Sequence, residues 1–546
     1  MKTTALTFSI PLAAILAALT RATPTSPLSS TDPSDLTKNA NHVFNAIHSA
    51  LRQWGSSLNH NGMSYFLATV PNGTHLYHGT GQEEPVTGME WLAFEPEQSL
   101  LYAGTRREMR LPGRGAGSPL GEDPGEGGPP GGGRRLAEEG SSPSRGSFGG
   151  DDWQQPLFEG APPEGDPELG GYLHMYRASH PLRLLYVDGE AAAKSEKGTL
   201  DSQDYVLLNE TGGADFAWDY ERARRMCNLA ATEWNGRIDG ILRMQGGFEI
   251  IVCSFEDSLE VVRVTHVKLQ GWSSGRMQEF EAFDYWRAVT SRYNGLGWDR
   301  VLMNYDQFVT AFDAKYEIDL FREVDGRTLP RLVNATTEQA RMIRADIRRV
   351  ILGIGVDVSL PENSFNWQGI ADLIVGRYAS RLKFLVSPSL STLEAVQTEI
   401  EYALQTSIDY ERRNSTAELE RCAVQFIPEA APTPSESMAA AVIAHIAHII
   451  CSTLQSAAKE NSYEAAVQKV KGLIEYLDWT TWRECGPCDA DQLCMIPIWP
   501  LGMLEDFTKP KCLNSTQLLH RAEYWRIKRP PSRRLYAPDR NGRIIL

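Results

Sequence analysis

The stretch that decides the fold spans residues 64–80 and reads SYFLATVPNGTHLYHGT. Both ends of this stretch are rich in aromatic and β-branched residues, which favour strands. Pro71-Asn72-Gly73 stands between them, and Asn-Gly between two strand-like runs is a strong hairpin signal. The sequence therefore predicts strands over 64–70 and 74–79 that pair with each other as a hairpin.

Periodicity predicts further strands and then a change to helices. Alternating or continuous apolar runs indicate strands, whereas apolar residues three and four apart indicate amphipathic helices. Expected strands are Tyr172–Arg177, Leu182–Val187, Phe248–Phe255 and Leu259–Leu269. Expected helices are Val43–Trp54, Asp219–Trp234, Arg276–Tyr293, Thr337–Leu352, Trp367–Phe384, Ser391–Tyr410, Glu436–Leu454 and Tyr463–Leu477.

One segment accounts for much of the glycine and proline. The chain of 546 residues holds 46 Gly and 31 Pro, and 19 of those Gly and ten of those Pro lie between Gly104 and Gly171. This segment lacks the apolar residues that offset the entropy of ordering, so we expect a disordered insert within one domain. Arg106-Arg107 and Arg134-Arg135 would be accessible dibasic processing sites there, or ordinary loop charges.

These patterns predict an α+β fold: a small split β-sheet domain interrupted by the insert, an α-helical domain and a Cys-rich C-terminal region. The expected divisions follow the changes in composition. They are a signal peptide at 1–22, a split α+β domain at 41–103 and 172–270, the insert at 104–171, a mainly helical domain at 271–480, a Cys-rich region at 481–520 and a basic tail at 521–546.

The compartment is indicated by three features. Lys2 and the largely apolar run Leu6–Leu19 resemble a secretory signal peptide. Eight cysteines, an even number, predict disulfides in an oxidising compartment, and their pairing is not deducible. They are Cys227, Cys253, Cys422, Cys451, Cys485, Cys488, Cys494 and Cys512. Asn-x-Ser/Thr sequons predict an exported glycoprotein, and they lie at Asn72, Asn209, Asn334, Asn414 and Asn514.

Charge and hydropathy narrow the partners. The net charge of −15 repels phosphate backbones and disfavours nucleic acid. The apolar run Met438–Leu454 contains His445 and His448 and is short for a membrane span, so it is interpreted as a buried helix. The two histidines share a helix face, but no carboxylate or cysteine completes a metal site with them, and no metal is predicted. We expect a soluble, secreted protein without a membrane span.

Two short motifs have both a functional and a structural interpretation. Cys485-Gly486-Pro487-Cys488 spells a thioredoxin active site, but it lies 58 residues from the end of the chain, outside an α/β unit. Structural disulfides are favoured there over a zinc site or redox catalysis. Gly271-Trp272-Ser273-Ser274-Gly275 matches the nucleophile elbow of α/β-hydrolases, yet the alternating βα pattern is missing, which favours a simple turn.

Acidic residues also cluster at Glu90, Glu95 and Glu97. Glycosidases use paired carboxylates, but the separation of two carboxylates cannot be read from sequence. A secreted serine or glycoside hydrolase therefore stays an alternative.

The sharpest constellation is dispersed along the chain. Tyr77-His78-Gly79-Thr80 ends a strand, and Trp91-Leu92-Ala93 opens a run that continues to Ser99 and Tyr102. Much later, Glu249 is a lone acid in the apolar run Phe248–Val252. A charged group in such a run is costly unless it is paired, lies in a cleft or points outward from an edge strand.

This arrangement resembles the His-Tyr-Glu branch of the ADP-ribosyltransferase superfamily. The resemblance implies that His78 and Gly79 bind the ribose and nicotinamide of NAD, and that Tyr102 stacks on the nicotinamide. It implies that Ser99 and Trp91, which stands where the family usually has tyrosine, complete the cofactor site. Glu249 would support the oxocarbenium-like transition state and, with His78, act in catalysis.

The functional reading has three forms. The chain is an exported NAD-dependent ADP-ribosyltransferase, an inactive binding derivative of that fold or another non-catalytic interaction protein, or a hydrolase. It also resembles large secreted proteins of filamentous fungi, in the runs Leu182–Gly189 and Gly198–Asp204, which brings no activity with it.

Overall fold

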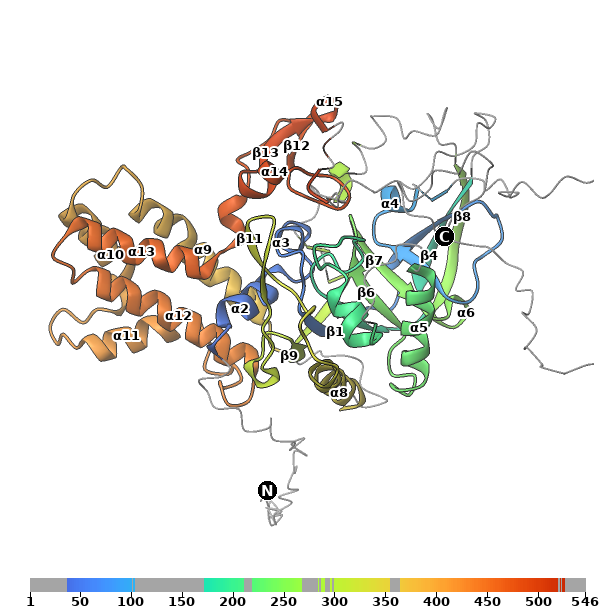
Figure 1. Cartoon of the computed structure of the whole chain (residues 1–546), viewed down its shortest axis with the longest axis horizontal. Coiled ribbons are helices and arrows are strands. Elements are labelled where there is room, and N and C mark those ends of the chain that lie inside the picture. Colours follow the sequence, from blue (N-terminus) through green and yellow to red (C-terminus); the bar gives the residue numbers. More distant parts are fainter. Residues whose placement is uncertain are drawn as a thin grey trace, which may run out of the picture.

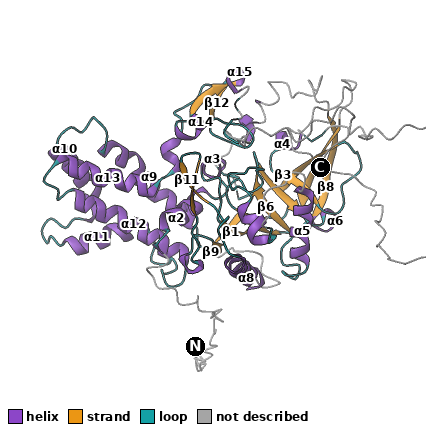
Figure 2. Cartoon of the chain, viewed as in Figure 1, coloured by secondary structure: helices purple, strands orange, loops and turns teal. Residues whose placement is uncertain are grey.

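A nine-stranded sheet forms the centre of the α+β unit in the computed structural model. The structure describes residues 37–100, 102–103, 171–210, 219–267, 283, 286–289, 295–296, 299–353, 364–518, 521 and 523–525. The strands neighbour one another in the order β8-β4-β2-β3-β7-β6-β5-β1-β9, and Figure 2 shows them gathered in one half of the molecule. They are β1 (Ser64–Val70), β2 (His75–Thr80), β3 (Glu90–Ala93), β4 (Gly171–Ala178), β5 (Leu182–Val187), β6 (Gly240–Met244), β7 (Phe248–Val252), β8 (Leu259–Val267) and β9 (Leu302–Thr310).

The hairpin prediction for residues 64–80 is wrong, although both strands exist. β1 pairs with β5 and β9, whereas β2 pairs with β3 and β4. The register of β1 on β5 continues unchanged into that of β2 on β4, from Tyr65↔Val187 to Thr80↔Tyr172. Pro71–Thr74 is therefore a bend within one long interrupted strand, and the turn's Gly73 has φ +81°. The pairing of β1 and β2 with distant strands makes the Asn-Gly pair part of a bend and not of a hairpin turn.

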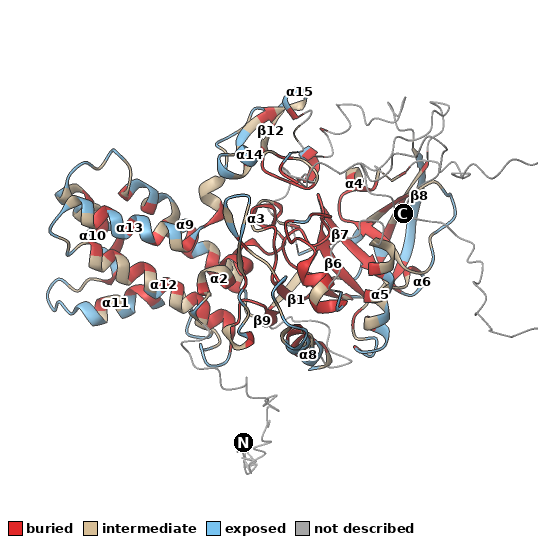
Figure 3. Cartoon of the chain, in the orientation of Figure 1, coloured by how far each residue is buried: buried red, intermediate tan, exposed pale blue. Residues whose placement is uncertain are grey.

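Helices cover the sheet and complete its core. They are α2 (Ala40–Ser49), α3 (Gln53–Leu58), α4 (Pro96–Leu100), the π-helix η1 (Ser202–Leu207), α5 (Asp219–Ala231), α6 (Phe255–Ser258) and α8 (Thr337–Gly353). The predicted first helix is broken at Leu51, whose φ is +56°. Figure 3 shows buried residues concentrated along β1, β6, β7 and the segments packed on them. One hydrophobic cluster joins this sheet to the helices that follow.

The region expected to be mainly helical begins with strands. β9 is the edge strand next to β1, and β10 (Phe321–Val324) and β11 (Arg327–Pro330) form a separate hairpin. The prediction missed all three because it treated the chain from residue 276 onward as helix. The sheet domain therefore extends past residue 300.

The helical unit lies beside the sheet unit (Figure 1). It contains α9 (Trp367–Leu385), α10 (Leu393–Leu404), α11 (Ser415–Val424), α12 (Met438–Ala457) and α13 (Tyr463–Leu477). Polar N-caps begin these helices, as when the Ser462 hydroxyl accepts from the Ala465 amide at 3.1 Å. α12 is long and apolar enough to cross a membrane by length and composition, but it packs against α2, α11 and α13.

The Cys-rich end is a small unit of short elements. β12 (Gln492–Met495) pairs with β13 (Lys511–Asn514), flanked by α14 (Leu504–Thr508) and α15 (Ser515–Leu518). One-turn 3-10 helices are η3 (Ala314–Tyr316), η4 (Gln405–Ser407) and η5 (Thr480–Arg483). The predicted α+β class, helical region and disulfide-bonded end are confirmed. The predicted signal peptide, most of the insert with its dibasic sites, the Ser273 motif and nearly all of the basic tail lie outside the described residues.

Candidate functional site

The sheet separates His78 from Glu249. Directly paired residues on neighbouring antiparallel strands project to the same face, and consecutive residues project to opposite faces. Tyr77 pairs with Ala93, and Ala93 pairs with Glu249, so Tyr77 and Glu249 share a face. His78 follows Tyr77 and projects from the other face. The structure does not bring His78 and Glu249 together.

The surroundings of His78 agree with this placement. Its ring lies 5.8 Å from that of Phe255 and 6.4 Å from that of His174. Nδ1 lies 2.7 Å from the carbonyl oxygen of Trp91, and only 4% of the residue is exposed. Burial lowers the pKa of His78 to about 4, although the contact with the carbonyl opposes the shift. His78 is a buried, neutral histidine held by its strand neighbour.

The Glu249 face at Gly79 is occupied by the protein itself. α4 packs on β2 so closely that a Cβ on Gly79 would lie 1.8 Å from the carbonyl oxygen of Ser99. Glycine is needed there for this approach, and no room is left above it for a nicotinamide. Tyr102, half-buried just after α4, donates its backbone N–H to that same carbonyl of Ser99 at 3.0 Å. Trp91 lies on the Glu249 face, 6.2 Å from the ring of Tyr220.

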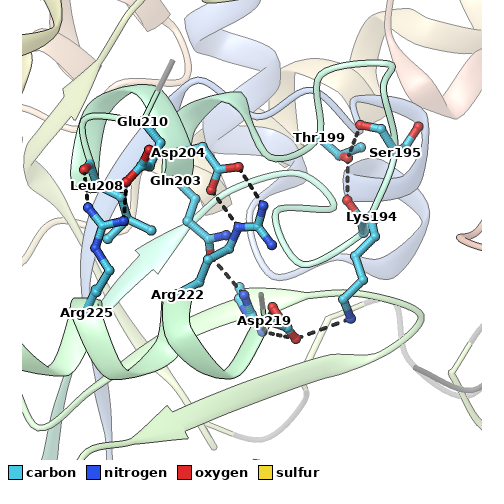
Figure 4. A network of polar contacts seen from close by, with 12 residues as sticks. Lys194, Ser195, Thr199, Gln203, Asp204, Leu208, Glu210, Asp219, Arg222 and Arg225 are labelled. Atoms are coloured by element: carbon cyan, nitrogen blue, oxygen red, sulfur yellow. Dashed lines mark hydrogen bonds and ion pairs between the residues drawn. The ribbon is translucent and has the colours of Figure 1, made fainter. Parts of the chain in front are cut away.

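Glu249 is a buried member of a four-charge cluster, which we call the Glu249 network: Lys194, Asp219, Arg243 and Glu249. It is not on an edge strand, because β7 lies between β3 and β6. Arg243 donates to Glu249 at 2.8 Å and to both oxygens of Asp219 at 3.2 Å. Lys194 lies 3.2 Å from Asp219. Figure 4 shows Lys194 and Asp219 reaching toward each other, with the neighbouring pair Asp204 and Arg222.

The Glu249 network is balanced in charge. Burial raises the pKa of Glu249, and the charge of Arg243 opposes the shift. Burial also acts on Asp219, but Arg243 and Lys194 outweigh it and hold the pKa of that carboxyl well below its usual range. Two cations face two carboxyls, so the network needs no further ion. Such a cluster fixes the positions of β6, β7 and α5.

The other predicted motifs resolve into structural roles. Among Glu90, Glu95 and Glu97, Glu95 forms an ion pair with Arg300 at 3.0 Å, while Glu90 accepts from the adjacent Trp91 amide. His445 is half-buried and His448 is exposed on α12. In the described part of the chain, none of these positions belongs to a group of three or more possible metal ligands.

All eight cysteines are paired, as predicted. The bonds are Cys227–Cys253, Cys422–Cys451, Cys485–Cys494 and Cys488–Cys512. Cys485 and Cys488 each bond a different partner, so the Cys-Gly-Pro-Cys motif is structural in this state. Among the described residues, the single His/Cys/Asp/Glu group close enough to hold a metal is Cys485, Cys488 and Cys494, which are all in disulfides. Four disulfides indicate an oxidising environment such as the secretory pathway.

The sequons differ in exposure. Asn72, Asn209, Asn334 and Asn414 are exposed, and Asn514 is half-buried. Asn72 lies in the bend between β1 and β2, on the rim of a cleft of about 630 Å³. Tyr77, Phe94 and the Glu95–Arg300 pair line this cleft.

A second buried polar cluster contacts the loop 188–201, which joins β5 to η1, through Lys197. We call it the Arg327 cluster: His60, Arg327, Phe507, Tyr524 and Trp525. The Arg327 guanidinium lies 4.1 Å from the ring centre of Phe507 and 4.9 Å from that of Tyr524. The His60 ring stands edge-on to Phe507, Tyr524 and Trp525, at 5.2 to 6.0 Å. Sequence reasoning missed this cluster entirely.

The polar atoms of the Arg327 cluster have few hydrogen-bond partners. Nε and both Nη atoms of Arg327, both ring nitrogens of His60 and the hydroxyl of Tyr524 are buried, and none forms a hydrogen bond of regular geometry with a described residue. At less regular geometry, Arg327 contacts the Tyr524 hydroxyl and the His60 ring contacts the Ser57 backbone. Burial, together with the charges of Arg327 and Lys197, lowers the pKa of His60 to about 3. His60 is therefore neutral.

Nearby charges do not balance Arg327. Lys197 lies over the Tyr524 ring at 4.9 Å and pairs with Asp325, while Arg483 lies 4.8 Å from the Phe507 ring and pairs with Asp478 at 3.1 Å. Glu190 is fully buried, and burial raises its pKa well above the usual range, which favours the neutral acid. Among the described residues, Arg327 is thus a cation of the cluster for which no ion pair is formed.

Fold and clusters together define an α+β protein of the oxidising compartment with one balanced and one unbalanced buried polar site. A protein-family profile described as the YPL277C N-terminal domain matches residues 32–273. The chain is 25% identical over 558 residues to "Uncharacterized protein YOR389W" of Saccharomyces cerevisiae, covering 86% of this chain and 83% of that protein. It is 26% identical over 397 residues to "Uncharacterized protein YPL277C" of the same yeast, covering 63% and 74%.

The comparisons bear out the coarse resemblance to fungal proteins of uncharacterised activity. No solved structure matches this chain. The ADP-ribosyltransferase-like topology therefore stays a prediction, and no activity is carried over from the relatives.

Proposed function

We propose that this chain is an exported, non-catalytic binding glycoprotein that takes a small carboxylate-bearing ligand at the Arg327 cluster. The observation that supports the proposal is the Arg327 guanidinium, whose nitrogen atoms are buried next to the Tyr524 hydroxyl without an ion pair among the described residues. Arginine does not lose its charge in proteins, so this cation stays uncompensated until an anion reaches it. A buried charge without an ion pair destabilises the folded state by roughly several kcal/mol. An anionic ligand that pairs with the charge would remove this destabilisation.

Three side chains of the cluster carry hydrogen-bond donors. Arg327 offers a planar fork that fits a carboxylate with two parallel hydrogen bonds. The Tyr524 hydroxyl and the one N–H of neutral His60 add two more donors, and both residues are at least nine-tenths buried. Aromatic walls with a few polar groups are typical of small-molecule sites.

Entry of a ligand requires the C-terminal segment to move, because it supplies three of the five cluster residues. Described residues near the two ends of this segment are hydrogen-bonded to each other: Tyr524 donates its amide to the Gly502 carbonyl at 2.9 Å, and Trp525 donates its indole N–H to the Leu501 carbonyl at 2.8 Å. The disulfide Cys488–Cys512 ties the segment to the preceding loop. Because β13 also pairs with β12, we expect the described residues of the segment to move together with β12.

Binding rather than ADP-ribosyl transfer is favoured because His78 and Glu249 project from opposite faces of the sheet. The Glu249 network, moreover, is compensated internally. Neither observation favours hydrolysis, so no second function is proposed.

The experiment is a titration of the purified full chain with acetate, succinate and inorganic phosphate, with acetamide as the neutral control and chloride as the ionic-strength control. Binding is read by isothermal calorimetry and by the unfolding temperature. The proposal expects saturable binding of a carboxylate that Arg327→Met abolishes. Arg322→Met, on the same hairpin but paired with Asp319 near the surface, is the matched control and should bind as wild type does. Binding of phosphate alone, or binding that survives Arg327→Met, would contradict the proposal.

A further inference from the structure

We propose that Asn72 carries an N-linked glycan whose first sugars lie in the cleft beside β2. This inference goes beyond the proposed binding function and does not depend on it. The sequon Asn72-Gly73-Thr74 occupies the bend between β1 and β2, and the Asn72 side chain is exposed on the rim of the cleft. A glycan attached to Asn72 would therefore start at a residue that lines the cleft.

The local backbone presents Asn72 to a modifying enzyme. Thr74 donates its amide to the Pro71 carbonyl at 3.2 Å, and Gly73 with φ +81° completes the turn. Asn72 therefore stands at the tip of a turn, with the Thr74 hydroxyl two residues on, which is the exposed geometry that a sequon requires. The four disulfides indicate the compartment where this modification occurs.

The reaction is a group transfer from a lipid-linked pyrophosphate oligosaccharide. The amide nitrogen of Asn72 forms a bond to the anomeric carbon of the first sugar, and the bond from that carbon to the pyrophosphate oxygen breaks. The lipid pyrophosphate leaves, and one amide proton passes to a base of the transferase. No oxidant or reductant is needed.

The cleft has the size and lining for a saccharide. Its volume of about 630 Å³ lies within the range of small-molecule sites. His75 and Tyr77 are two residues apart on β2, so both rings project from one face of the sheet, and both line the cleft. Phe94 and Pro96 also line it, although Phe94 is almost fully buried. Flat rings offer apolar surface to the C–H face of a sugar, as the aromatic side chains of ligand sites do.

The polar floor of the cleft suits hydroxyl and acetamide groups. Glu95 is 5% exposed and forms its ion pair with Arg300, whose guanidinium lies 5.6 Å from the Phe94 ring. Asp299 adds an exposed carboxylate at the edge. Carboxylates accept hydrogen bonds from sugar hydroxyls without a change in charge state.

The test uses the full chain expressed through a eukaryotic secretory pathway. Glycopeptide mass spectrometry should find Asn72 occupied, and Thr74→Ala, which keeps Asn72 but removes the sequon, should leave it unmodified. Digestion of the native protein with an endoglycosidase then compares Asn72 with Asn334, an exposed sequon that does not line the cleft. We expect about tenfold slower release at Asn72, because the sugars must leave the cleft before cleavage.

Tyr77→Ala should equalise the two rates while the Asn72 glycan stays attached. His75→Ala, an exposed position on the same face, serves as the second variant if Tyr77→Ala fails to fold, and it should also speed release at Asn72. Unmodified Asn72 in the wild type overturns the proposal. Equal release at Asn72 and Asn334 in the wild type overturns it as well.

Discussion

The Glu249 network and the Arg327 cluster both contact the loop 188–201, through Lys194 and Lys197, and they compensate buried charge to different degrees. In the network, Arg243 meets Glu249, Asp219 and Gln203, and Lys194 meets Asp219. In the cluster, Arg327 contacts aromatic rings and the Tyr524 hydroxyl, and it forms no ion pair with a described residue. A protein can keep a balanced buried network for structure alone. An unbalanced one has a stability cost that a ligand can remove.

The largest loss of stability is expected for a substitution in the Glu249 network. Arg243→Met leaves Glu249 and Asp219 without their shared cation, and we expect a loss of about 3–5 kcal/mol in the free energy of unfolding. Chemical denaturation measures this loss. Arg224→Met is the matched control on α5, because Arg224 pairs with Glu221 at the surface and should contribute less than about 1 kcal/mol. Equal losses in the two variants would show that the network is not a structural centre.

A second prediction concerns Asp188, at the start of the loop between the two regions. Its carboxylate accepts from the Ser64 amide at 2.8 Å, and burial raises its pKa from 3.8 to about 7. The folded state thus keeps a proton that the unfolded state loses, so this group's stabilisation is complete below pH 4 and is lost as the pH rises toward 7.

Asp188→Asn removes that titration and keeps an acceptor for Ser64. The difference in unfolding free energy between the variant and the wild type should therefore move in the variant's favour between pH 4 and pH 7, by up to about 4 kcal/mol. Urea denaturation at a series of pH values measures it. A difference that does not change with pH would mean that Asp188 ionises normally in the folded protein.

We expect no release of nicotinamide from NAD by this protein. Because His78 and Glu249 lie on opposite faces, the wild type and Glu249→Gln should both leave NAD intact in a chromatographic assay of nicotinamide release. Release by the wild type that Glu249→Gln abolishes would restore the transferase reading and break the contrast between the two regions.

Local patterns in the sequence predicted elements well and their partners poorly. The strands over 64–70 and 182–187 and the helix over 463–477 match the structure to the residue, because each is set by its own periodicity. The same periodicity does not predict which strands pair with each other, so the bend at Pro71–Thr74 was predicted to be a hairpin turn. β9 was missed because it lies between two expected helices, in a region expected to be mainly helical, where no strand was assigned.

The Glu249 network and the Arg327 cluster also differ in how far the sequence could predict them. Arg243 and Glu249 stand on adjacent strands joined by the tight turn at Gln245–Gly247, so opposite charges flanking Gly-Gly were a usable signal for their pairing. His60, Arg327 and Tyr524 come from positions hundreds of residues apart. No local pattern brings them together, and only the folded chain reveals that their polar atoms have few partners.

The central claim is that the Arg327 cluster is an anion site, and thermal unfolding of the wild type and Arg327→Met with and without acetate tests it most directly. Methionine keeps much of the packing against Phe507 and Tyr524 but removes the charge. Without acetate, the variant should be as stable as the wild type within about 1 kcal/mol, or more stable. With acetate, at constant ionic strength, only the wild type and the Arg322→Met control should gain in unfolding temperature. A gain of the same size in Arg327→Met would contradict the account.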